Sequence, residues 1–146
     1  EKAVHRLVYN LHSNWEDLFQ DKDTESFLSL FMPEFTTNEV TIDTRNIPHV
    51  ERHNNTDFVE HITALANTAD LRADFSNTQF LSTFVKDDIF TITYQTRLEI
   101  KDPYQTVQES KIICYVSGEK LEGMWKVGNY SWTRYDFMEN KYQVAR

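Results

Sequence analysis

Glycine, proline and cysteine are scarce in this sequence, with three, three and one residues among 146. Three glycines leave little room for a glycine-rich loop of the kind that holds phosphate groups. The single cysteine, Cys114, excludes an intrachain disulfide framework, and its place in the apolar run 112–116 predicts a core-filling role. The sequence shows no Ser/His/Asp order typical of a catalytic triad and no Cys/His metal cluster. We therefore predict neither a cofactor nor a metal ion.

Basic residues are also few. The chain has 15 lysines and arginines against 23 aspartates and glutamates, which gives a formal net charge of −8 and a pI near 5.0. Binding to nucleic acid requires clustered positive charge that displaces counterions, so we discount DNA, RNA and anionic membranes as partners. No run of about 18 apolar residues occurs, so we also predict no membrane span.

The single cysteine fits a reduced compartment, and on that ground we expect a cytoplasmic protein. The chain begins at Glu1 rather than methionine, which leaves open a leader removed from a longer chain. With 40% hydrophobic and 14% aromatic residues, the 146 residues suit one compact domain, residues 1–146, with a sizeable core.

The clearest pattern is a period of two between residues 89 and 100. Phe90, Ile92 and Tyr94 alternate with threonine and glutamine, and Leu98 and Ile100 continue the apolar face. Such alternation predicts a half-buried strand. Similar patterns predict four long strands at about 71–85, 88–101, 105–117 and 120–136, with turns at 86–88 and 117–119.

Two of these strands change phase partway. Large residues are odd-numbered at Trp125 and even-numbered at Tyr130 and Trp132, so we predict a β-bulge at Gly128. A similar change occurs near Asn77. Long bulged strands bend, so the sheet should curl around the helices.

The first part of the chain reads as helices. Apolar residues at i, i+3, i+4 and i+7 from Val4 to Phe19 predict an amphipathic helix. A second helix, capped by Asp23 or Thr24, should carry Phe31 and end by Met32, because Pro33 cannot continue it.

A short strand at 37–43 should follow, and then an irregular connection that contains residues 47–50. We expect a third helix to be capped by Asn55 or Thr56, with acidic residues in its first turn. The predicted class is α+β, with three N-terminal helices packed into a strongly curved, mainly antiparallel sheet.

This order of elements resembles the nuclear transport factor 2-like superfamily, a cystatin-like cone that includes SnoaL-type polyketide cyclases, ketosteroid isomerases and scytalone dehydratases. The resemblance spans nearly the whole chain and rests on packing motifs: residues 23–31, 40–43, 55–62 and 123–127. It implies a ligand pocket between the concave sheet and the helices. Scytalone dehydratases carry a histidine near the start of the long strand, where this chain has Asp74, which counts against their mechanism.

The resemblance directs attention to Asp43, at the end of the first predicted strand, where ketosteroid isomerases place a general base. A carboxylate in an apolar cone would have a raised pKa, which suits proton abstraction beside a carbonyl. The alternative is that Asp43 caps the turn into residues 44–46 and faces water. Tyr9 or His53 would serve as the electrophilic donor.

Related folds also set hydrogen-bond donors at the pocket mouth, where Tyr9, His12 and Trp15 would flank one side of the first helix. For His12, the usual intermediate burial of histidine favours the alternative of an ordinary boundary histidine. Tyr94, Trp125 and Trp132 would line the pocket or fill the core. His49 and His53 have i, i+4 spacing, with His61 nearby in sequence, but Pro48 argues against a helix there, so we predict no metal site.

Two functions are compatible with this sequence. The first is that of a non-catalytic domain that binds a small apolar or cyclic ligand or serves as an interaction module. The second is that of a cofactor-free isomerase, dehydratase or cyclase that acts on a cyclic carbonyl compound. We also expect a homodimer that pairs through the outer face of the sheet, since Thr91, Thr93 and Gln95 leave that face only weakly charged.

Overall fold

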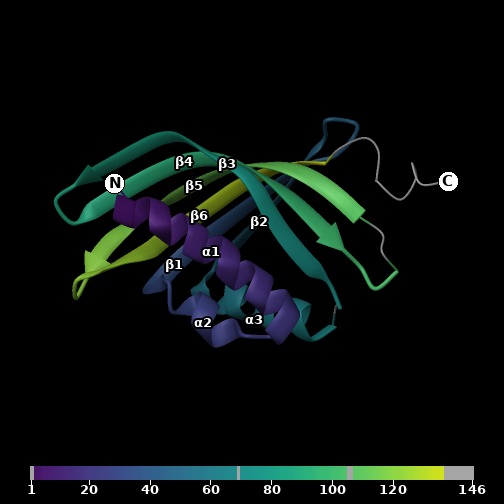
Figure 1. Cartoon of the computed structure of the whole chain (residues 1–146), viewed down its shortest axis with the longest axis horizontal. Helices are drawn as coiled ribbons and strands as arrows, with labels where there is room; N and C mark the ends of the chain where they lie inside the picture. The colour runs from purple at the N-terminus through teal and green to yellow at the C-terminus, as the bar shows by residue number, and fades with distance from the viewer. Residues whose placement is uncertain (1, 69, 105–106, 137–146) are drawn as a thin grey trace.

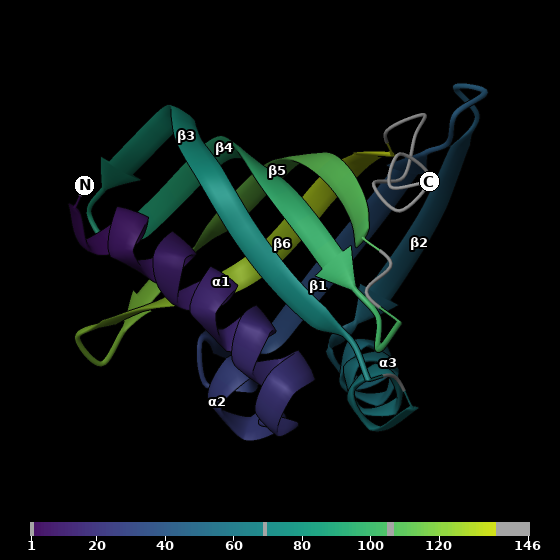
Figure 2. The ribbon, with the colours of Figure 1, turned by 45° about the vertical axis from the view of Figure 1, so that its right-hand side comes forward.

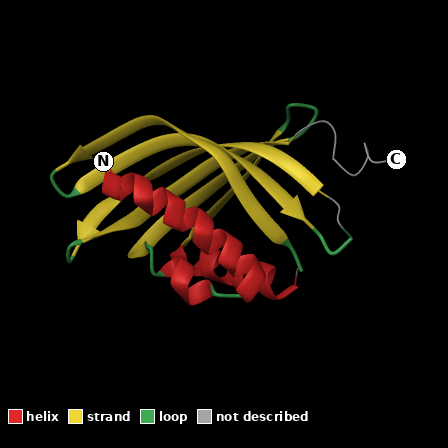
Figure 3. Cartoon of the chain, viewed as in Figure 1, coloured by secondary structure: helices red, strands yellow, loops and turns green. Residues whose placement is uncertain are grey.

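The computed structural model describes residues 2–68, 70–104 and 107–136, which form three helices and one six-stranded sheet (Figures 1 and 3). Both ends of the predicted domain, and residues 105–106 where the third long strand was expected to begin, lie outside the described residues. The elements in chain order are α1 (Lys2–Asp21), α2 (Thr24–Leu28), β1 (Phe31–Ile42), β2 (Pro48–Asn54), α3 (Asn55–Thr68), β3 (Arg72–Lys86), β4 (Ile89–Lys101), β5 (Val107–Leu121) and β6 (Met124–Asp136).

The sheet has the strand order β2-β1-β6-β5-β4-β3. All neighbouring strands are antiparallel except β1 and β6, which run parallel. The helices gather on the concave side, and Figure 2 shows the strands curling over them. The predicted α+β class and the mainly antiparallel, curved sheet are therefore confirmed.

Irregular pairing at the predicted positions explains the curvature. Between β5 and β6, Ser117 pairs with Asn129 while Gly118 pairs with Val127, which leaves Gly128 as the extra residue. The pairing of β3 with β4 also shifts beside Asn77, whose φ is 54°. The phase of the large residues predicts both bulges, and each bends a long strand.

Helix α1 has the predicted amphipathic pattern. Its apolar residues Val4, Leu7, Val8, Leu11 and Leu18 are buried against the sheet and the other helices. Strand β4 likewise buries the predicted face, with Phe90, Ile92 and Tyr94 all within 1% of full burial. The core therefore lies between α1 and the concave face of the sheet.

The second helix is shorter than predicted. It ends at Leu28, and Phe31 already belongs to β1 instead of to the helix. A strand can pass through Pro33 here because the β1 pairing with β6 is interrupted between Phe31 and Thr36, so no ladder hydrogen bond is lost.

Strand β2 was not predicted, because it lacks an alternating apolar face. All its residues except His53 are exposed, and it forms the edge of the sheet by pairing with β1. Helix α3 then begins one residue earlier than expected. The side-chain Oδ1 of Asn54 accepts a hydrogen bond from the Asp57 amide at 2.9 Å, so Asn54 is the cap.

The turn predicted at 117–119 is wrong. Strand β5 continues through Gly118 to Leu121, and the chain reverses at Glu122 and Gly123, whose φ angles are 51° and 81°. Positive φ at both positions is typical of a tight hairpin turn. Gly118 is needed within the strand, because a Cβ there would overlap the Lys126 carbonyl oxygen.

Candidate functional site

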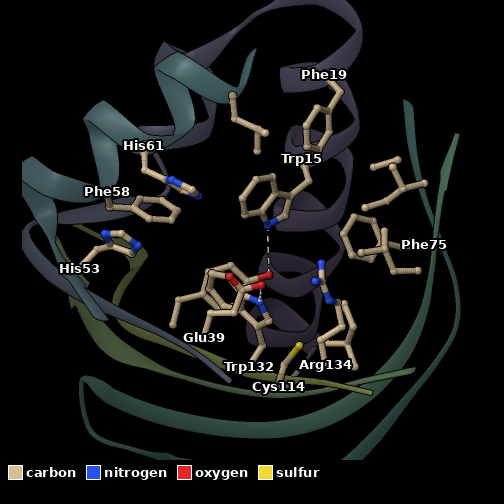
Figure 4. Close-up of a pocket in the computed structure, with 16 residues that line it drawn as sticks. Trp15, Phe19, Glu39, His53, Phe58, His61, Phe75, Cys114, Trp132 and Arg134 are labelled. Atoms are coloured by element: carbon tan, nitrogen blue, oxygen red, sulfur yellow. Dashed lines mark hydrogen bonds between the residues drawn. The ribbon is translucent and has the colours of Figure 1, made fainter. Parts of the chain in front are cut away.

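A pocket of about 120 Å³ lies between α1, α3 and the concave face of the sheet (Figure 4). Every strand contributes at least one side chain to its wall, because the curved sheet directs the inward residues of all strands toward one centre. The lining residues are Trp15, Phe19, Glu39, His53, Phe58, His61, Leu65, Ala73, Phe75, Leu98, Ile100, Ile112, Cys114, Tyr130, Trp132 and Arg134.

Aromatic side chains dominate the wall. The ring of Trp15 lies edge-to-face with Trp132 at 6.4 Å between centroids and with Phe58 at 6.4 Å. Tyr130 packs against Trp132 at 4.9 Å. Each ring is positioned by contacts with other rings, so the aromatic wall is already in place before any ligand arrives.

Hydrogen bonds fix the two indoles that line the pocket. The Nε1–H of Trp132 donates to Oε2 of Glu39 at 2.9 Å, and the Nε1–H of Trp15 donates to the Tyr130 hydroxyl at 3.2 Å. Figure 4 shows both bonds as dashed lines. The polar groups that remain in the wall are the Glu39 carboxylate, the Arg134 guanidinium and the imidazoles of His53 and His61.

A buried polar layer extends from His12 and Tyr94, behind the aromatic wall, to Cys114 and Tyr130 in the wall itself. The Nε2 of His12 and the Tyr94 hydroxyl are 3.2 Å apart, and the His12 ring stacks on Phe75 at 4.3 Å. Burial lowers the pKa of His12 to about 4. Burial also raises the pKa of Cys114 to about 12 and holds the pKa values of Tyr94 and Tyr130 well above the ordinary range. This layer is therefore uncharged at pH 7.

The structure brings three of the predicted site residues to the pocket: Trp15, His53 and Trp132. His12 and Tyr94 lie behind its wall as buried core residues and are not part of the lining. Tyr9, placed at the pocket mouth by prediction, is 50% exposed and packs edge-on against Phe80, outside the lining.

The predicted environment of Asp43 is wrong. The residue sits in the turn between β1 and β2, outside the pocket, where its carboxylate accepts hydrogen bonds from the amides of Ile47 and Arg45 and contacts His49 at 3.0 Å. The Ile47 amide and then His49 lower the pKa of Asp43 to about 2 instead of raising it. Asp43 therefore acts as the turn cap that was the alternative interpretation.

Trp125 also lies outside the pocket, contrary to its predicted role in ligand binding. It is partly buried, with its ring edge-to-face with Phe90 at 5.5 Å and the Lys120 ammonium 5.6 Å from its centroid. The bulge at Gly128 keeps Trp125 on the same face of β6 as Trp132, but Trp125 lies at the start of the strand, beside the turn at 122–123, whereas the pocket is lined by residues 130–134.

Three polar residues of the pocket were not predicted from the sequence: Glu39, His61 and Arg134. Glu39 precedes Asp43 by four residues on β1, so it lacks the strand-end position that draws attention to Asp43. Arg134 is even-numbered like Tyr130 and Trp132, so the alternation along this strand could have predicted that it faces the pocket. His61 is placed by the packing of α3 beside β2, and the unpredicted β2 strand hid that contact.

No family model matches this sequence, and no curated protein matches it either. Solved structures do share its fold. A protein of Streptomyces avermitilis, named a putative dehydratase from the NTF2-like family, aligns with a TM-score of 0.68 and 8% identity over 94% of this chain and 96% of that chain. An NTF2-like protein of unknown function from Pseudomonas putida aligns with a TM-score of 0.62 and 14% identity over 91% and 84%.

A third structure, a protein of unknown function with a cystatin-like fold from Nostoc punctiforme, aligns with a TM-score of 0.55 and 12% identity over 90% of this chain and 88% of that chain. The chain therefore has the NTF2-like, cystatin-like fold, which confirms the fold predicted from the sequence. Identities this low establish the fold alone. Among the described residues, no helix combines the length and apolar character that a membrane crossing requires.

Proposed function

We propose that this chain is a binding module for a small, largely apolar, cyclic molecule, held in the pocket between α1, α3 and the sheet. The observation that carries this proposal is the preformed aromatic wall, in which Trp15 packs edge-to-face against both Phe58 and Trp132 around a cavity of about 120 Å³. An apolar cavity of about 150 Å³ accepts benzene, so a single ring is the appropriate size class.

The polar groups of the wall would orient such a ring. Arg134 and the two histidines provide hydrogen-bond donors, while Glu39 provides an acceptor. A ring that carries one hydroxyl or carbonyl group could therefore place its polar atom at one of these groups and its carbon atoms against the indoles. For one-ring compounds we expect dissociation constants between about 1 μM and 1 mM.

Calorimetric titration with phenol tests the proposal. Ala73 lies on the wall and is only 9% exposed, so Ala73→Leu extends a side chain into the cavity. We expect saturable binding to the native chain and at least about tenfold weaker binding to Ala73→Leu. The matched control is Trp125→Phe, outside the pocket, which should bind like the native chain. Equal affinity of a folded Ala73→Leu variant would overturn the proposal.

A second candidate function is proton transfer beside a carbonyl group. The Glu39 carboxylate and the His53 imidazole line the same pocket, so a base and a hydrogen-bond donor face one bound ring. The dehydratase name of one protein with this fold supports this class by analogy only. Deuterium exchange at the α-carbons of cyclohexanone, followed by NMR, tests it.

Exchange should exceed the rate in buffer and be lost in Glu39→Gln, while Asp43→Asn outside the pocket should retain it. Exchange at the buffer rate by a native chain that binds cyclohexanone would leave the binding module as the function. Exchange that survives Glu39→Gln but falls in Asp43→Asn would contradict the assignment of Glu39.

A further inference from the structure

Three side chains with metal-ligating atoms converge at the edge of the pocket. Glu51 and His53 are two residues apart on β2, so both project to the same side of this edge strand. His61 projects from α3, and one ligating atom from each of the three lies within 4.8 Å of the others. Figure 4 shows the two imidazoles side by side on one wall of the pocket.

His53 has a buried ring nitrogen that lacks a hydrogen bond. Its Nε2 is shielded from solvent and has no hydrogen-bond partner within the part of the chain that the structure describes. The nearest acidic atom, Oε2 of Glu51, is 3.6 Å away, beyond hydrogen-bond range. A buried polar atom without a partner calls for an explanation, and an ion is one of the few available.

The two imidazoles also lie in contact with each other. The rings of His53 and His61 stack with centroids 5.0 Å apart and an interplanar angle of 18°. Two imidazoles beside one carboxylate form the donor set that Zn²⁺ prefers, whereas Ca²⁺ and Mg²⁺ require oxygen ligands.

We propose that Glu51, His53 and His61 form a site for a divalent transition metal of the Zn²⁺ class at the mouth of the pocket. In a tetrahedral zinc site, ligating atoms are roughly 3.4 Å apart, given bonds of about 2.1 Å. The separation of 3.6 Å between Glu51 and His53 is already close to this value. His61 is exposed, so its ring can turn out of the stack to complete the set.

The geometry of the three ligands leaves one coordination position open. His53 and His61 both line the pocket, whereas Glu51 lies outside the lining with a side chain that is 58% exposed. The remaining position of the ion would therefore face the cavity, which is the arrangement of zinc sites that keep an open position. This site goes beyond the proposed binding of a cyclic ligand and does not depend on it.

The sequence-based prediction of no metal paired His49 with His53 and noted His61 only as a nearby histidine. His49 instead contacts the Asp43 carboxylate at 3.0 Å at the start of β2. The partner of His53 is His61, eight positions later and on another element. That pairing becomes visible only once β2 and α3 are placed side by side.

Calorimetric titration of the chelator-treated full chain with Zn²⁺ tests the site, and Co²⁺ absorption reports the coordination number. We expect one equivalent to bind and four-coordinate visible bands to appear with Co²⁺. Loss of one ligand should weaken binding by roughly 100-fold or more in His61→Ala, since even indirect supports of a metal site contribute 10–100-fold. Glu51→Gln, also at an exposed position, should weaken binding by at least about tenfold.

The matched control is His49→Ala, an exposed histidine on the same strand outside the cluster, which should bind Zn²⁺ like the native chain. Circular dichroism checks that each variant is folded. The proposal is overturned by the absence of saturable binding at one equivalent, by native affinity in both His61→Ala and Glu51→Gln, or by equal weakening in His49→Ala. None of these results affects phenol binding by the native chain and Ala73→Leu, so the two proposals fail separately.

Discussion

Acid should destabilise this protein through one buried histidine. His12 is 5% exposed, stacks on Phe75 and contacts the Tyr94 hydroxyl, and burial lowers its pKa from 6.5 to about 4. In the unfolded chain the imidazole takes up a proton near pH 6.5, but the folded chain resists protonation down to about pH 4. Protons therefore favour the unfolded state between these two values.

The size of the effect follows from the difference between the two pKa values. At 1.36 kcal/mol per pKa unit, the free energy of unfolding should fall by about 3 kcal/mol as the pH drops from 6.5 to 4. Above pH 6.5 this contribution is fully present, and below pH 4 it is fully lost. For a domain of this size, about 3 kcal/mol is a large share of the total stability.

Urea unfolding of the native chain and of His12→Gln, each at several pH values from 7 to 4, measures the effect. Glutamine keeps a polar side chain but does not titrate, and all other ionisable groups are common to both proteins. The native chain should therefore lose about 3 kcal/mol more than the variant across this range. Parallel pH profiles for the two proteins, or an NMR titration of His12 with a pKa near 6.5, would refute the reasoning.

Three further predictions concern the sheet. Gly118→Ala should lower the free energy of unfolding by about 3 kcal/mol or more, because the added Cβ would overlap a backbone oxygen. Gly123→Ala has open space around it and should cost only about 1 kcal/mol of left-handed backbone strain. Equal losses in the two variants would contradict this prediction. Trp125→Ala should lower the free energy of unfolding by about 2 kcal/mol. This is below the roughly 3–5 kcal/mol usual for a fully buried tryptophan, since the ring is only partly buried. An unchanged urea midpoint would show that the contacts of Trp125 contribute nothing. Homodimerisation through the outer sheet face stays a prediction. Sedimentation should give a mass of twice 17.3 kDa for the native chain and 17.3 kDa for Tyr115→Lys, because Tyr115 is 42% exposed on that face. A native species that stays at 17.3 kDa as the concentration is raised would rule pairing out.

The fold could be predicted because its main elements carry strong local patterns. The alternation around Tyr94 places the apolar residues of β4 on one buried face, and the helical spacing from Val4 onward does the same for α1. The phase change at Gly128 marks a bulge. Strand β2 was not predicted, because an exposed edge strand has no alternation of buried and exposed side chains. Its stability comes from pairing with β1, and a single sequence does not display that pairing.

The site was predicted less well, since it depends on which residues converge from distant elements. Trp132 could be predicted because a large aromatic residue on an inward face points to a core or a pocket, and Trp15 because the family resemblance places the first helix beside the pocket mouth. Asp43 failed because a strand-end carboxylate has the same local pattern whether it faces a cavity or closes a turn. The hydrogen bonds that the Arg45 and Ile47 amides donate to Asp43 show that it closes the turn, and these bonds are seen only in the three-dimensional structure.

The most direct test of the central claim, that the pocket binds a small ring, is an NMR titration of methyl-labelled protein with benzene. The methyl groups of Leu98 and Ile112 line the pocket, while Val4 and Val116 are fully buried core residues outside the lining. Ring binding in the pocket should shift the resonances of Leu98 and Ile112 in a saturable manner and leave those of Val4 and Val116 in place. Shifts that are absent, or equal in all four residues, would contradict the account.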